Sequence, residues 1–504
     1  MDESCEIISI WRNVFVKISS SNTANGTFQM SRCGLSILFS WTPTCTNNNN
    51  ICDIDPGHIA FAIELNQIDS ISIDKSNIDH GILEIFLKDY SKFPKIIFTQ
   101  HGNLAVSHLV NYLVDQKLAT FFHKTSPNIQ ITSASSQIRC FPCNCANLVR
   151  YKILVSHWMA LDLLGVHEII ETKPILNYSS IQNFPDYEFK QACFTSRLDD
   201  SIRYKVWPRL LKTFINDDYC TTIWSKLTRR QLIEIEPIIE KVNQNTEWLS
   251  TSNNCTKLNQ LFIREVLQTL ALYHPNLAYD CLGEVLFLFI KIFIKSFPEQ
   301  DSNVDKESKQ IEMKDGRVIS YIEARQFIFS HFTSFISRTH LDYLLLSHRK
   351  NYKSYSEKIY SIILAINNCI SEKLIVYELK DFAFIYDSIY SMYSKDFDED
   401  SVLRLWDTII SYQDEKVDFL LFFNAAVTIM LFTPMFMQKI KDKGKIIEVA
   451  KETLKRLDID TLIRMTSKLI EIIKAKKDME WIFVNPVDDK NYLDYTPKYL
   501  KLVK

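Results

Sequence analysis

Residues 402–407 read VLRLWD, and the apolar run FLLFF follows at residues 419–423. Apolar side chains recur there at the spacing of one helix face, at Leu403, Trp406, Ile409 and Ile410. A second stripe with the same period runs through Ile263, Val266, Leu267 and Leu270. A period near 3.6 residues predicts helices that each bury one face. We therefore expect residues from about 186 to 480 to form an all-α domain.

An upstream segment, residues 201–211, reads SIRYKVWPRLL. Together with residues 402–407 it resembles the TBC-domain family, whose members activate Rab GTPases. The positions that match the family are Arg203, Trp207, Arg404, Trp406 and Asp407. We interpret both tryptophans as core residues. Arg404 and Asp407 lie three residues apart, which favours bracing of neighbouring helices over contact with a ligand.

Two further stretches correspond to the catalytic motifs of that family, residues 235–241 (IEPIIEK) and 279–286 (YDCLGEVL). The resemblance implies I-x-x-D-x-x-R with an arginine finger in the first and Y-x-Q-G with a glutamine finger in the second. The alignment places Lys241 at the arginine, Cys281 at the glutamine, Ile238 at the aspartate and Leu282 at the glycine. We expect Lys241, Tyr279 and Cys281 to contact the GTPase, with no catalytic residue intact.

These replacements are expected to weaken the chemistry that GTP hydrolysis requires, and a lysine makes a poor finger because it keeps the charge without the bidentate geometry. An arginine fork bonds two phosphate oxygens at once, whereas a lysine offers a single charged point. A thiol cannot orient water as an amide does. The first alignment can slip by a few residues, but no arginine occurs between Arg230 and Arg264. A second departure is Asp387, where the family often carries a basic residue before an F-x-R-E-F stretch, here YSKDF at 393–397.

The N-terminal segment has a different period. Residues 35–41 and 59–65 alternate apolar and polar side chains, and residues 71–73 and 82–87 look like further strands. A helix is expected over 106–118. This predicts a small β-barrel of the pleckstrin-homology type, closed by one helix. The WTP at residues 41–43 and the entry to the helix resemble the Rab-binding domain of the small-G-protein signalling modulators.

These patterns predict an α+β multidomain chain. We expect a PH-like Rab-binding domain at 1–123, a linker at 124–185, a TBC domain at 186–480 and a tail at 481–504. A charged insertion at 298–317 is expected to form a loop inside the TBC domain.

Composition narrows the class of protein. The formal charge of −2 gives no global field toward nucleic acid. The first residues lack the pattern of a secretory signal, and the 12 cysteines have no disulfide-like rhythm, so we expect reduced thiols in a cytoplasmic protein. Cys140, Cys143 and Cys145 could seed a zinc site with His157 or His167, but ordinary cysteines are favoured. No phosphate-binding loop motif occurs, and we expect no cofactor and no metal.

Three functions remain open. The favoured one is recognition of a Rab-type GTPase in membrane traffic, with GTPase activation weak or absent and with recruitment to endomembranes through partners. The first alternative is a functional activator with a non-standard finger, so whether the chain has catalytic activity stays open. The second alternative is a helical scaffold that binds no GTPase. No transmembrane segment is expected, because polar residues and Pro434 interrupt the apolar run after Phe419.

Overall fold

The computed structural model describes residues 5–17, 23–33, 36–44, 60–74, 80–88, 93–122, 128–131, 163–164, 175–213, 224, 227–247, 257–273, 281–298, 309–346, 348–414, 416–432 and 442–483. The chain divides into two compact units. The first comprises Met1–Ile170, Ile366–Lys373 and Val427–Leu457. The second comprises Glu171–Ala365, Leu374–Ala426 and Asp458–Lys504.

In the described residues of the first unit, one antiparallel sheet has the strand order β4-β3-β2-β1-β7-β6-β5-β9-β8. Its strands are β1 (Cys5–Lys17), β2 (Thr23–Cys33), β3 (Ser36–Pro43), β4 (Phe61–Glu64), β5 (Ile68–Asp74), β6 (Gly81–Leu87), β7 (Lys95–Phe98), β8 (Ala119–Phe121) and β9 (Asn128–Ile131). A short 3-10 helix, η1 (Leu65–Gln67), joins β4 to β5.

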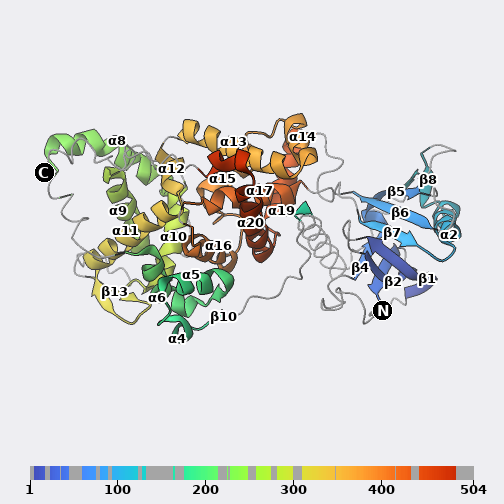
Figure 1. The fold of residues 1–504 in the computed structure, drawn as a ribbon, viewed down its shortest axis with the longest axis horizontal. Helices are drawn as coiled ribbons and strands as arrows, with labels where there is room; N and C mark the ends of the chain where they lie inside the picture. The colour runs from blue at the N-terminus through green and yellow to red at the C-terminus, as the bar shows by residue number, and fades with distance from the viewer. Residues whose placement is uncertain are drawn as a thin grey trace. The chain divides into compact units, whose positions relative to one another are not determined.

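One helix covers this sheet. Helix α2 (Gly102–Asp115) packs against β6 and β7, as Figure 1 shows in the part of the chain drawn in blue. Residues alternate between buried and half-buried along β6, which is the period of a strand with one face on the core. The core between sheet and helix holds Phe28, Phe39, Phe98 and Leu109. The Trp41 indole donates to the Val14 carbonyl at 3.0 Å.

The predicted combination of an antiparallel sheet domain and a helical domain is confirmed. The sheet is larger than predicted, because β1 and β2 were not expected and β9 lies beyond residue 123. In the strand pairings of the described residues, β4 and β8 are the two ends of the order and do not pair with each other. Closure into a barrel of the pleckstrin-homology type therefore stays a prediction.

Two glycines allow the helix to approach the sheet. A Cβ atom on Gly81 would lie 2.2 Å from the Gly102 carbonyl oxygen, and a Cβ atom on Gly102 would lie 2.1 Å from the Gly81 nitrogen. Real Cβ atoms do not come this close to backbone, so a side chain at either position would push α2 away from β6.

Replacement of Gly102 by alanine is expected to destabilise the sheet domain by about 1–3 kcal/mol, the usual cost of overpacking. Hydrogen exchange measured by mass spectrometry on peptides from β6 and α2 would report this as faster local exchange. The control is Gly444→Ala, where the nearest atom to the new Cβ is a flexible Asp442 carboxylate oxygen at 3.3 Å. Equal exchange in the Gly102→Ala variant and the unchanged protein would contradict the close approach.

The rest of the described chain is mainly helical. Its longer helices are α5 (Asp186–Thr195), α6 (Asp200–Leu211), α8 (Arg229–Asn245), α9 (Lys257–Tyr273), α10 (Leu282–Phe293), α11 (Tyr321–Arg338), α13 (His348–Ile366), α14 (Asn368–Val376), α16 (Glu399–Ser411), α17 (Phe419–Leu431), α19 (Lys443–Leu454) and α20 (Ile459–Lys474). Shorter helices are α4 (Tyr178–Ile181), α12 (Leu341–Leu346), α15 (Tyr386–Tyr390), η4 (Ala383–Ile385) and η5 (Lys477–Ile482).

Side chains at the helix starts explain several of these bounds. Asp199, Asp398 and Asp458 each accept a hydrogen bond from a backbone N–H in the first turn of α6, α16 and α20. Ser320 and Glu323 form a reciprocal capping box at the start of α11. The sequence therefore fixes where these helices begin, close to the bounds that hydrophobic periodicity indicates.

Aromatic rings fill the centre of the second unit, where α6, α10, α11 and α16 contact one another (Figure 1). Trp207 of α6 stacks on Phe335 of α11, with ring centroids 5.4 Å apart. Trp406 of α16 lies 5.1 Å from the same phenylalanine. Both tryptophans are fully buried. This ring cluster joins helices that are distant in the sequence.

Short strands accompany the helices. β10 (Ile175–Leu176) and β11 (Arg197–Leu198) pair in parallel, and β12 (Ile294–Ser296), β13 (Gln310–Met313) and β14 (Val318–Ser320) form an antiparallel sheet. The second half of the charged insertion at 298–317 thus contains a strand and a tight turn, which differs from the expected loop. Gly316 has a φ of 84° in that turn, a conformation that favours glycine. None of the helices in the described residues is long and apolar enough to cross a membrane.

Candidate functional site

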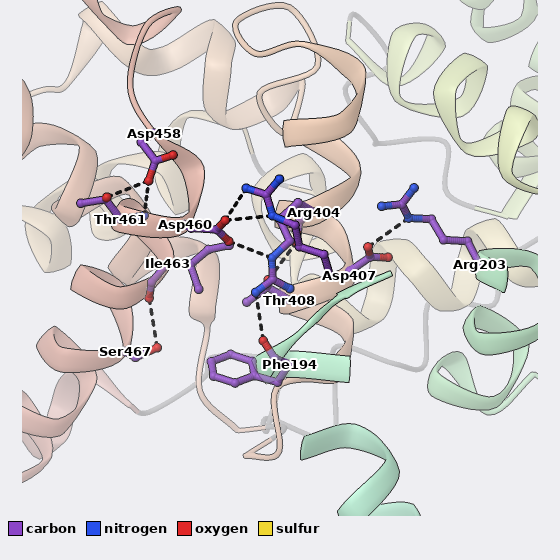
Figure 2. Close-up of polar contacts among 11 residues, drawn as sticks. Phe194, Arg203, Arg404, Asp407, Thr408, Asp458, Asp460, Thr461, Ile463 and Ser467 are labelled. Atoms are coloured by element: carbon purple, nitrogen blue, oxygen red, sulfur yellow. Dashed lines mark hydrogen bonds and ion pairs between the residues drawn. The ribbon is translucent and has the colours of Figure 1, made fainter. Parts of the chain in front are cut away.

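A buried carboxylate connects α6 to α16. Asp407 of α16 is 0% exposed and accepts hydrogen bonds from Arg203 Nε at 3.0 Å and from Trp207 Nε1 at 2.7 Å. Arg203 also pairs with Asp200 at the start of its own helix. Figure 2 shows Arg203 pointing at Asp407. Three of the five residues that match the family are therefore joined in one contact.

A second ion pair connects α16 to α20. Arg404 donates from Nε to Asp460 Oδ1 at 3.1 Å and from its terminal nitrogen to the Phe194 carbonyl at 3.1 Å (Figure 2). Arg197 donates to the other oxygen of Asp460 at 3.0 Å. Sequence reasoning missed Asp460, because nothing in its neighbourhood distinguishes it from a solvated helix residue.

The two carboxylates have opposite electrostatic environments. Burial raises the pKa of Asp407, and the charge of Arg203 with the hydrogen bonds from Trp207 and Arg203 offsets this only in part. Burial also acts to raise the pKa of Asp460, but the hydrogen bonds and charges of Arg197 and Arg404 outweigh it and lower that pKa. Asp407 thus depends on its partners to remain ionised, since water does not reach it.

The stretch that the resemblance aligns with the first finger motif, residues 235–241, lies on α8. Ile235 is 2% exposed and packs with Leu272 of α9, with Ile239 beside them. Lys241 is exposed and Ile238 is half-buried. At the end of the helix, Asn243 accepts from Gln268 at 2.9 Å. One face of α8 therefore packs against α9, and Lys241 lies on the exposed side of α8.

The helix also contains a second register of the same motif. A start at Ile239 places Val242 at the aspartate and Asn245 at the arginine, one residue before the buried Thr246. Four residues correspond to slightly more than one helical turn, so the two registers differ by about one turn of α8. In both alignments an aliphatic residue occupies the position of the family's aspartate, and neither alignment has an arginine at the position of the finger.

The second finger motif lies at the start of α10. Cys281 is the residue immediately before the helix and is half-buried, and Leu282 is 0% exposed. Tyr279 lies outside the described residues. Glu284 pairs with Lys395 at 2.8 Å, which joins this helix to the YSKDF stretch. Burial lowers the pKa of Lys395, but the hydrogen bond and charge of Glu284 and the charge of Cys281 outweigh this and raise it.

Lys241 thus lies on α8 and Cys281 lies immediately before α10, and both of these helices pack against α9. An exposed ammonium and a half-buried thiol can provide a charge and a weak polar contact, but neither can provide a bidentate donor or a water-orienting amide. The cysteine cluster at 140–145 and both candidate histidines lie outside the described residues. Within the described ranges, no group of three His, Cys, Asp or Glu side chains could hold a metal ion.

Comparison with protein families identifies a match in the helical part of the chain. The family model described as Rab-GTPase-TBC domain matches residues 200–437. This range starts at α6 and includes both finger motifs, Arg404 and Asp407, but it ends before Asp460. No curated protein matches the chain.

Proposed function

Residues 200–437 are a Rab-GTPase-TBC domain, and from this premise we propose that the chain binds a Rab-family GTPase in membrane traffic with little or no acceleration of GTP hydrolysis. The observation that carries the proposal is the loss of both fingers together. Lys241, or Asn245 in the second register, stands at the arginine, and Cys281 stands at the glutamine.

The physical reason is the nature of the transition state. Phosphoryl transfer needs a positively charged group that faces the negatively charged equatorial oxygens, and it needs a positioned water. A finger arginine alone contributes on the order of 10³–10⁵ in rate. Lys241 is exposed and keeps one charge, and the buried Leu282 occupies the place of a small residue that leaves backbone open. α8 and α10, which place these positions, both pack against α9, so the binding surface can persist without the chemistry.

We expect the purified protein to bind at least one GTP-loaded Rab and to raise its single-turnover hydrolysis by less than about 100-fold, below the usual finger contribution. A panel of Rabs would be assayed for affinity and phosphate release side by side. Lys241→Ala is the matched variant, because Lys241 is exposed and its removal disturbs no packing.

Each outcome of that panel selects one function. Binding with slow hydrolysis supports the proposal. Acceleration above about 100-fold that Lys241→Ala abolishes would instead establish an activator with a lysine finger. Absence of binding to every Rab would favour a scaffold that holds other proteins.

We further propose that the N-terminal sheet domain is a PH-like Rab-binding domain that recruits the protein to endomembranes through its GTPase partner. The support is its antiparallel sheet with one covering helix, together with the local resemblance at Trp41–Pro43.

Removal of residues 1–131 is expected to leave the helical domain folded and to weaken binding to the cognate Rab by at least about tenfold, equivalent to about 1.4 kcal/mol. The boundary follows the end of β9 at Ile131. Circular dichroism would check that the helices persist. Equal affinity of the truncated and full chains would exclude the sheet domain as the anchor.

A further inference from the structure

A small cavity lies in the second unit, away from both finger motifs in the sequence. Its walls come from α6, the end of α10, the β13–β14 hairpin and α11, and its volume is about 190 Å³. An apolar cavity of about 150 Å³ is large enough to hold a benzene ring. The cavity therefore has room for one ring and a small substituent, and it is too small for a nucleotide.

Two polar atoms in its walls have no hydrogen-bond partner. His331 is 1% exposed, and its Nδ1 lies 2.8 Å from the Phe327 carbonyl oxygen. Since a carbonyl can only accept, Nδ1 carries the proton and Nε2 is left as an acceptor. Both His331 Nε2 and Thr213 Oγ1 are buried and unsatisfied. An unsatisfied buried polar group costs about 1–3 kcal/mol, so both atoms favour a ligand that bonds them.

The protonation of His331 supports this assignment. Burial lowers its pKa to about 4, and the hydrogen bond with Phe327 offsets this only in part. The imidazole is therefore neutral near pH 7, and Nε2 keeps its lone pair. A ligand group facing it must donate a hydrogen bond.

Three of the other residues that line the cavity are aromatic, namely Tyr204, Phe293 and Phe327. Phe327 stacks on His331 with centroids 4.0 Å apart, and Phe293 lies 5.3 Å from the same ring. Tyr204, Pro208 and Met313 complete the apolar lining. Asp315 and Arg317 lie at the cavity but pair with each other at 2.7 Å. Since that pair neutralises itself, the cavity offers no net charge and suits an uncharged aromatic ring.

We propose that this cavity binds a single aromatic ring that carries one hydroxyl group, either as a free phenol or as a tyrosine side chain. The hydroxyl donates to His331 Nε2 and accepts from Thr213 Oγ1. A hydroxyl suits the site because it is a donor and an acceptor at once, whereas an indole N–H only donates. The ring fills the space between Phe293, Phe327 and Met313.

The first test compares p-cresol with toluene, which has the same shape without the hydroxyl. The full chain would be labelled with ¹³C at its methionine methyl groups, and Met313→Leu would assign the signal of Met313. We expect p-cresol to shift the Met313 signal and to bind at least about tenfold more tightly than toluene. Absence of a shift, or equal affinity of the two ligands, would overturn the proposal. Tighter binding of 3-methylindole than of p-cresol would also overturn the hydroxyl assignment.

The second test uses variants. His331→Phe keeps an aromatic ring beside Phe327 and removes the acceptor, and Thr213→Val keeps the shape and removes the hydroxyl. Each should reduce the preference for p-cresol over toluene to near unity. His108→Phe and Thr195→Val, at exposed or partly exposed positions outside the cavity, should leave it unchanged. If His331→Phe does not fold, the proposal is tested by Thr213→Val and by the comparison of ligands. A preference for p-cresol over toluene that persists in Thr213→Val would contradict a hydroxyl bonded to both side chains.

A third ligand distinguishes between the two sources of the ring, a free phenol and a tyrosine side chain. N-acetyltyrosine amide places peptide groups on the same phenol. If it binds at least as tightly as p-cresol, a tyrosine side chain of a partner is the occupant, and if only p-cresol binds, the occupant is a free phenol. Failure of all three ligands overturns this site without affecting the proposed GTPase binding, because that proposal is assayed on Rabs.

Discussion

Lys241→Arg combined with Cys281→Gln is expected to raise Rab-dependent GTP hydrolysis by at least about tenfold, and either change alone should do little. Both fingers act on one transition state, so their effects are strongly non-additive. A complete arginine finger increases the hydrolysis rate on the order of 10³–10⁵-fold. We expect the double variant to recover only part of this increase, because Ile238 and Leu282 still differ from the family at the supporting positions. Single-turnover phosphate release is the measurement.

The second register provides the matched control. Asn245→Arg with Cys281→Gln tests a finger placed one helical turn further along α8. Recovery in one pair and not in the other identifies the register directly. Ile238→Asp can then be added at a half-buried position of α8. Leu282→Gly would empty a fully buried site and cost about 2–5 kcal/mol, so it is added last.

Inactivity of every combination would contradict the idea that only the chemistry is missing. Asp387, whose charge is opposite to that of the family's basic residue, is the place to look for lost docking in that case. Affinity measured beside hydrolysis separates the two explanations, because lost docking lowers binding to the helical domain and lost chemistry does not.

Asp407→Asn is expected to destabilise the helical domain by about 3–5 kcal/mol, the range seen when one partner of a buried ion pair is removed. Asp407 is 0% exposed, and its substitution leaves the buried Arg203 with Asp200, whose side chain is 60% exposed, as a remaining carboxylate partner. Trp207 also loses a charged acceptor at 2.7 Å. Denaturation of the full chain followed by circular dichroism would measure the shift, and hydrogen exchange in α6 and α16 would locate it.

The control for this variant is Asp414→Asn. Asp414 pairs with Lys474 at 2.7 Å, but both side chains are about two-fifths exposed. Such a pair contributes about 0–1 kcal/mol. Equal effects of the two substitutions would show that burial of Asp407 is not what makes its contacts important.

The sequence predicted elements that keep a regular period. β6 and the buried stripe of α16 were found because their alternation is uninterrupted. β2 was missed although its burial alternates from Ala24 to Met30, because its first buried positions are Ala24 and Gly26, whose small size gives no hydrophobic pattern. β1 was missed because the register of its pairing with β2 shifts between Ile7 and Ser9 and again between Trp11 and Val14. Each shift moves the following side chains to the other face, so no single period of two spans the strand. The short β13 was hidden by the charged residues around it.

The sequence also predicted only part of the candidate site, namely the residues that belong to local motifs. Motif residues such as Arg203 and Asp407 can be singled out from local spacing, and they do lie together. Asp460 and His331 could not be found in this way, because their roles depend on contacts with distant helices or on the lack of any partner for one atom. Contacts between distant helices, and a buried atom without a hydrogen-bond partner, arise only when the chain has folded.

The link between Arg203 and Asp407 joins residues 204 positions apart, and Arg197 and Asp460 are 263 apart. At about 5–20 residues per second, synthesis takes roughly 10–40 s to deliver Asp407 after Arg203. During that interval the nascent chain carries α6, with Trp207, before α16 is available to pack against it, although α10 and α11 have already been made. The N-terminal sheet, whose described pairings all fall within residues 5–131, can form far earlier. The helical domain therefore cannot complete these contacts until Asp407 and Asp460 have been synthesised, and the apolar surfaces that they close stay uncovered for longer than those of the sheet.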